Sequence, residues 1–216
     1  MGKQVKTFCG ICVLLSAASA VASTVYDNGA PVFGGVNVTQ VRGADDFVLG
    51  AATTITGVRF FGDTPGTPAN FPGAFSGTLS YAFYADPAGA PGAMIDSGSV
   101  SGLTGVASGL FYVIDFNLNS PLSLGAGSYW LEIHEGATLS TDDGNPIFWG
   151  GLNSSPAGNA MLGSSLNTVP NTDLNFELAF QLFSDPVTSG APEPGTLVLF
   201  AAPLAAAVFH LRRKRL

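Results

Sequence analysis

The chain has 216 residues, of which 46% are hydrophobic and only 11% are charged. Six of its eight basic residues lie near the two ends, so residues 23–191 keep only Arg42 and Arg59 beside 14 acidic side chains. With His134 neutral, the formal charge of this middle part is −12. Such a field repels phosphate backbones and anionic lipid surfaces, which excludes nucleic acid as a partner.

The first 22 residues have the sequence pattern of a secretory signal peptide, and we expect their apolar part to form a helix. Lys3 and Lys6 form a basic start, residues 8–15 are apolar, and Ala20-Val21-Ala22 matches the small-residue pattern that signal peptidase cleaves. We therefore predict cleavage after Ala22, with Ser23 as the first residue of the mature protein. An uncleaved anchor or a buried helix is the alternative, although a membrane span needs about 20 apolar residues.

Both cysteines, Cys9 and Cys12, lie inside this segment. The mature chain is therefore expected to contain no disulfide and no thiolate metal site. Neither cysteine has the neighbours that a lipoprotein signal requires.

Residues 23–183 are predicted to form a single antiparallel β-sandwich of jelly-roll type. Short runs rich in β-branched and aromatic residues alternate there with Gly, Pro, Asn and Asp, which is the pattern of strands separated by turns. About ten strands are expected, a number and spacing typical of a sandwich. The expected strands are residues 36–41, 46–49, 53–61, 78–84, 94–100, 110–118, 128–134, 147–149, 160–162 and 173–183.

The last of these, DLNFELAFQLF at residues 173–183, has the clearest pattern. Leu174, Phe176, Leu178, Phe180 and Leu182 alternate with more polar residues. Because successive side chains of a strand point to opposite faces, this pattern predicts one continuous strand with one buried face. The other face, which includes Glu177, is expected to be wet.

Three segments are predicted to lie outside the strands. Residues 63–73 contain three prolines and are expected to form an exposed excursion. Residues 141–146, TDDGNP, are expected to form a polar turn. Residues 184–191 are expected to form a flexible linker between the sandwich and the C-terminal tail.

The tail, residues 192–216, has three parts in order. Pro192-Glu193-Pro194 comes first, an apolar segment covers residues 195–211, and Arg212-Arg213-Lys214-Arg215 comes last. The fifteen residues 195–209 would rise about 23 Å as a helix, somewhat less than the about 30 Å of a bilayer core. A transmembrane helix is therefore predicted, with its basic end in the cytoplasm and the sandwich outside.

This tail resembles the PEP-CTERM sorting signal of Gram-negative bacteria. The resemblance covers about 25 residues and implies that Pro192, Glu193 and Pro194 are the recognition motif and that residues 212–215 are the cytoplasmic stop. It also implies removal of the tail by exosortase after a transient stay in the inner membrane, and a mature protein at the cell surface or in an exopolysaccharide matrix. A GPI signal has a similar organisation, with a spacer followed by an apolar tail that is removed. A permanent single-pass anchor is the alternative.

The body resembles the β-sandwich ectodomains found in proteins with this tail. The resemblance is carried by ADDFVL at 44–49, TITGVRFFG at 54–62, FYADPAGAPG at 83–92, LGAGSYWLEI at 124–133 and FWGG at 148–151. This second resemblance implies a β-sandwich fold and an extracellular location, and it does not indicate a ligand.

Residues suited to catalysis are few. His134 is the only histidine of the body, and we expect it to be an exposed residue at the end of a strand. The acidic pairs are Asp45 with Asp46, Glu132 with Glu135, and Asp142 with Asp143. Glycoside hydrolysis needs two carboxyl groups about 5–9 Å apart across a cleft, whereas neighbours on a strand point to opposite faces.

Calcium in a structural role is the one cofactor that the sequence leaves open. Calcium takes six to eight oxygen ligands, and YDNG at 26–29, ADD at 44–46 and TDDGN at 141–145 offer such oxygens. None of the three has the spacing of an EF-hand loop. A zinc site is not expected, because the body holds one histidine and no cysteine.

A sugar-binding patch is a further hypothesis. Trp149 comes soon after the acidic turn, so Asp142, Asp143, Asn145 and Trp149 could together stack and hydrogen-bond a sugar ring. The alternative is that Trp149 and Trp130 both belong to the core, where large aromatic side chains usually lie.

Together these patterns predict an exported, non-enzymatic surface or matrix protein with a structural or adhesive role and polysaccharide as its candidate ligand. Signal peptidase and exosortase are its expected processing partners. A secreted glycan hydrolase on the same sandwich is the competing hypothesis.

Overall fold

The computed structural model describes residues 22–63, 76–144, 146–152 and 160–185. The described residues form fourteen β-strands and no helix, and all strand pairs are antiparallel. The described residues thus contain no helix that is long and apolar enough to cross a membrane. The two expected terminal helices and the excursion after Asp63 lie outside the described residues.

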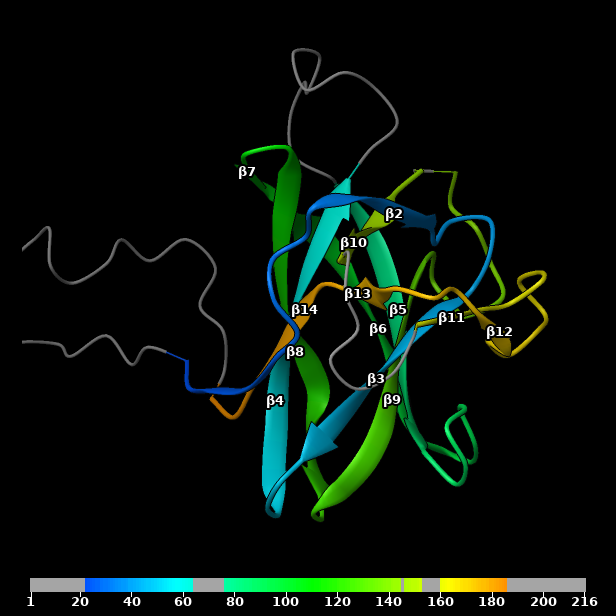
Figure 1. Cartoon of the computed structure of the whole chain (residues 1–216). Helices are drawn as coiled ribbons and strands as arrows, with labels where there is room; N and C mark the ends of the chain where they lie inside the picture. Colours follow the sequence, from blue (N-terminus) through cyan, green and yellow to red (C-terminus); the bar gives the residue numbers. More distant parts are fainter. Residues whose placement is uncertain (1–21, 64–75, 145, 153–159, 186–216) are drawn as a thin grey trace, which may run out of the picture. The chain divides into compact units, whose positions relative to one another are not determined.

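The strands form two sheets, which we call sheet A and sheet B (Figure 1). Sheet A has the order β1-β14-β4-β10-β13, with β8 on the other side of β4, β7 beside β8, and β2 beside β10. Its strands are β1 (Thr24–Asp27), β2 (Phe33–Asn37), β4 (Thr53–Asp63), β7 (Val106–Ser108), β8 (Phe111–Leu124), β10 (Phe148–Leu152), β13 (Glu177–Leu178) and β14 (Phe180–Phe183).

Sheet B has the order β12-β11-β3-β9-β5-β6. Its strands are β3 (Gly43–Leu49), β5 (Ser76–Ala85), β6 (Met94–Thr104), β9 (Gly127–Glu135), β11 (Met161–Leu162) and β12 (Thr172–Asp173). The expectation of an all-β chain with two antiparallel sheets is thus confirmed for the described residues. All ten predicted strand regions contain strand, although several bounds differ.

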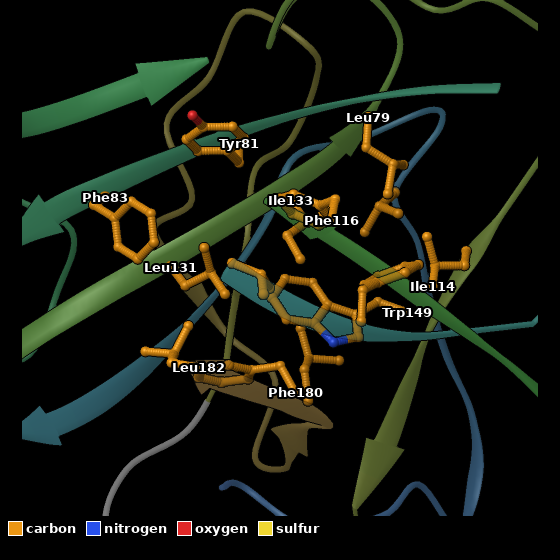
Figure 2. Close-up of a cluster of buried hydrophobic side chains, with 14 of the residues drawn as sticks. Leu79, Tyr81, Phe83, Ile114, Phe116, Leu131, Ile133, Trp149, Phe180 and Leu182 are labelled. Carbon is orange, nitrogen blue, oxygen red and sulfur yellow. The ribbon is translucent and has the colours of Figure 1, made fainter. Parts of the chain in front are cut away.

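Aromatic and aliphatic side chains from both sheets fill the core (Figure 2). Trp149 lies fully buried in it, with ring centroids 5.6 Å from Phe60 and 5.9 Å from Phe180. Its indole Nε1 donates a hydrogen bond to the carbonyl oxygen of Ala179 at 2.8 Å. Trp130 is also buried, within a smaller cluster that includes Tyr84. Both tryptophans therefore belong to the interior.

The predicted continuous strand 173–183 is wrong. The segment is divided into β12, β13 and β14. Asn175 separates β12 from β13 with a left-handed backbone whose φ is 57°, and β13 then pairs with β10 whereas β14 pairs with β4. The side chain of Asp173 accepts a hydrogen bond from the Asn175 amide at 2.7 Å, which closes a local turn. After this turn Glu177 is buried instead of wet, with 2% of its surface exposed.

Candidate functional site: a buried acidic cluster

The hypothetical sugar-binding patch does not form around Trp149. This side chain is fully buried, whereas Asp142 and Asp143 are exposed, and Asn145 lies outside the described residues. A sugar ring stacks on an exposed aromatic face, so the indole of Trp149 is not available to it. The acidic turn is polar and exposed, as the sequence suggests.

His134 is buried, which corrects the expectation of an exposed histidine. Its Nε2 lies 2.9 Å from the carbonyl oxygen of Thr141. A carbonyl only accepts, so Nε2 is the donor of this hydrogen bond. Nδ1 has no hydrogen-bond partner within the described ranges and is sealed from solvent. A general base must reach its substrate, and this imidazole is enclosed.

Glu132 belongs to a buried network on sheet B. Arg42 binds its carboxylate through both Nε and Nη2, the latter at 2.8 Å from Oε2. The Tyr84 hydroxyl also donates to Oε2, at 2.6 Å. Burial and the charge of Glu132 raise the pKa of Tyr84, so the phenol keeps its proton. Glu135 accepts a hydrogen bond from the backbone amide of Asp143.

Three other carboxylates converge at one place. Asp45 and Asp46 lie on β3 of sheet B, and Glu177 lies on β13 of sheet A. One carboxylate oxygen from each lies within 4.8 Å of the others. We call these three residues the acidic cluster. The expectation that strand geometry would keep Asp45 and Asp46 apart is therefore wrong for these oxygens.

Backbone and amide groups hold the cluster in place. Oδ1 of Asp45 accepts from the Asp46 amide at 3.0 Å, and Oδ2 accepts from the Leu178 amide at 2.6 Å. Asn28, just after β1, donates to Oδ2 of Asp45 at 2.9 Å and to Oε2 of Glu177 at 3.3 Å. The same amide donates to the Leu178 carbonyl at 2.8 Å. Asp45 thus joins sheet B to two segments of sheet A.

Tyr26 supports Asn28 from β1. Its hydroxyl donates to Oδ1 of Asn28 at 3.0 Å, which orients the amide so that its NH₂ group faces the carboxylates. Burial, together with the weaker effect of the Asp45 charge, raises the pKa of this phenol, so it remains a donor. Tyr26 also packs 5.3 Å from Phe180 and 5.7 Å from Phe47, between ring centroids.

The cluster is acidic without an arginine or lysine to balance it. Residues 22–185 contain two such basic side chains, Arg42 and Arg59, and each is bound to another carboxylate. Burial raises the pKa of Asp45 well above its usual range, and the neighbouring Glu177 raises it further. Burial and the charge of Glu177 also raise the pKa of Asp46, to about 6. Protons therefore carry much of the charge balance here.

The cluster is suited to holding protons and joining the two sheets. Asp45 and Glu177 are 0% and 2% exposed, so they do not flank an open cleft of the kind a glycosidase needs. Two of the three segments expected to supply calcium ligands do meet here, through Asn28 and through Asp45 with Asp46. However, both oxygens of Asp45 and Oδ1 of Asn28 already accept hydrogen bonds. Calcium stays a prediction.

The described residues thus form two antiparallel sheets, consistent with a β-sandwich, that enclose a small set of charged and titratable side chains: Arg42, Asp45, Glu132, His134, Glu135 and Glu177. Comparison with models of known protein families and with curated protein sequences found no match for this chain.

Proposed function

We propose that this chain is an exported, non-enzymatic protein of the cell surface or extracellular matrix, sorted by a PEP-CTERM-type signal. The order of three features carries the proposal: Pro192-Glu193-Pro194, the apolar residues 195–211, and the basic residues 212–215. A simple membrane anchor would account for the last two features and leave the first without a role. Signal peptidase and exosortase would be the two processing enzymes, and the inner membrane a transient stop.

The body supports a structural or adhesive role. Its one histidine is enclosed and bound to Thr141, and Glu132 is held by Arg42. Asp45 and Glu177 are shielded from solvent and used in joining the sheets. These are among the groups that a hydrolase of this sandwich would have needed in a cleft, and the remaining pair, Asp142 and Asp143, lies exposed after β9. We propose a jelly-roll-type sandwich as the displayed module.

Polysaccharide remains the candidate ligand class for an adhesive role. With Trp130 and Trp149 both buried, binding would depend on exposed hydroxyl, amide and carboxylate groups instead of stacking on these two rings. A secreted hydrolase and a permanently anchored protein are the competing proposals.

The test replaces Pro192, Glu193 and Pro194 with alanine in the native host. This change leaves the apolar segment and the basic end intact, so a simple anchor is expected to behave as before. A processed signal should fail, and the full-length chain should accumulate in the inner membrane. Epitope tags before Ser184 and after Leu216, detected by immunoblots of fractionated cells, report the outcome.

The matched control replaces Asp185, Pro186 and Val187 with alanine, three residues of similar kind upstream of the motif. This control should be processed like the wild-type protein. Retention of both tags in the membrane by the wild-type protein would contradict the proposal and favour the anchor.

A further inference from the structure

The last strand of sheet B has an open side. β6 is eleven residues long and is hydrogen-bonded to β5 alone among the described strands. Its register places Ser99 opposite Ser80 and Ser97 opposite Ala82. At about 3.3 Å per residue, this edge offers roughly 36 Å of backbone. An unpaired strand edge is a template for pairing with another chain.

Gly98 shows which way β6 faces. A Cβ atom at this position would lie 2.5 Å from the Tyr81 hydroxyl oxygen and 2.7 Å from the amide nitrogen of Asn119. Gly98 therefore faces the interior, and its neighbours Ser97 and Ser99 face away from it. The outward side chains at the centre of this edge are therefore small, whereas Met94 and Ile95 at its start are large and exposed.

The other described edges are short or carry a charge and a proline, whereas β6 is interrupted by two β-bulges in its pairing with β5, at Ile95 and at residues 101–102. β1 and β12 at the ends of the two sheet orders have four and two residues. Beyond its pairing with β7, β8 carries Asp115 and Pro121, two residue types that discourage strand pairing. β6 contains no proline, lysine or arginine, and Asp96 is the only charged residue between Met94 and Ile114.

Exposed hydrophobic side chains are frequent on β6 and on the segment that follows it. Seven large hydrophobic side chains are exposed among the described residues, and four of them lie on β6, on β7 or just after β7. These four are Met94, Ile95, Val106 and Leu110. An acidic body repels a second copy of itself, so two copies approach most easily where charge is scarce.

We propose that β6 is the interface for a second copy of this chain, paired antiparallel with its own β6 across a two-fold axis at Ser99. Ser99 is the midpoint of the strand and lies between its two β-bulges, so the regular part of this pairing is centred on residues 96–100. Each Asp96 stands opposite Gly102 of the other copy. The two Asp96 residues are then six positions apart, about 20 Å along the strand, which exceeds the Debye length at physiological salt.

Disulfide trapping tests this register in the full-length chain, purified in detergent, with Cys9 and Cys12 changed to serine. Ser99→Cys should form a disulfide-linked dimer on mild oxidation, because the axis places this residue opposite itself. Ser97→Cys and Ser101→Cys should form the disulfide mainly when the two variants are mixed. Ser128→Cys is the matched control, since Ser128 is an exposed serine of the interior strand β9; it should remain monomeric on the gel.

Charge provides the second arm. Ser97→Lys with Ser101→Lys places like charges opposite each other, so the Ser99→Cys dimer should fall by about tenfold. Gln40→Lys with Ser128→Lys adds the same charge at exposed sites away from β6 and should leave the dimer unchanged. Equal trapping at Ser99 and Ser128, or none at Ser99, would overturn the proposal. Circular dichroism of each variant tests whether it is folded. If the variant with two lysines is unfolded, the disulfide yields of the single-cysteine variants alone test the proposal.

Discussion

Replacement of Arg42 by methionine should lower the free energy of unfolding by about 3–5 kcal/mol. Arg42 is 7% exposed and its partner Glu132 is fully buried. Methionine fills a similar volume and donates no hydrogen bond, so Glu132 keeps only the Tyr84 hydroxyl among these partners. An ionised carboxylate in such a place is costly, and the cost appears as lost stability. Urea denaturation monitored by tryptophan fluorescence measures it.

The chain provides a matched control in its second arginine. Arg59 binds Asp115 with both Nε and Nη2, at 2.7 and 2.9 Å, but its side chain is 34% exposed. Exposed ion pairs contribute about 0–1 kcal/mol, so Arg59→Met should cost far less than Arg42→Met. Adding Glu132→Met to Arg42→Met should recover part of the loss. Equal losses for the two arginines would contradict the assigned burial of the Arg42 network.

The stability of the sandwich should fall as pH rises from about 4 past about 6. The pKa values of Asp45 and Asp46 are raised in the folded state, so the folded protein holds more protons than the unfolded chain in this window. Stability therefore decreases with pH, by roughly 1.4 kcal/mol for each unit by which a pKa is raised. Glu177 and Asp86 are the other titratable groups whose charges raise these two pKa values.

Asp45→Asn isolates this effect. An amide at this position can still accept from the Leu178 or Asp46 amide and no longer needs a proton, so the decline in stability above pH 4 should become shallower. Asp142→Asn is the control, because Asp142 is exposed and lies outside the acidic cluster. The melting temperature is measured at several pH values, with added calcium or with a chelator. This comparison separates the effect of proton binding on stability from that of metal binding. If stability falls with pH as steeply in Asp45→Asn as in the wild-type protein, the cluster does not hold the protons that we assign to it.

Much of the strand content could be predicted from the sequence, because period-two hydrophobicity reports burial directly. Residues 128–134 and 53–61, for example, are strand over their full predicted lengths. The jelly-roll type was an expectation from strand number, whereas the actual order of strands depends on contacts between distant segments. No local pattern specifies that β4 pairs with β8, β10 and β14.

The acidic cluster was missed for a physical reason. Alternation placed Glu177 on a wet face, but the turn at Asp173 and Asn175 interrupts the strand, so the alternation does not carry through to Glu177. Asp and Asn two positions apart are a turn signal, which the strong hydrophobic alternation around them obscured. The burial of His134 was equally hidden, because it depends on residues 136–141 returning to place the Thr141 carbonyl beside its ring.

Intact-mass analysis of the protein from its native host tests the central claim of export and sorting most directly. The account predicts a chain that begins at Ser23 and has lost the apolar and basic residues after Pro192-Glu193-Pro194, with or without an attached group at the new C-terminus. A mature protein of 22.0 kDa that keeps both Met1 and Leu216 would contradict it.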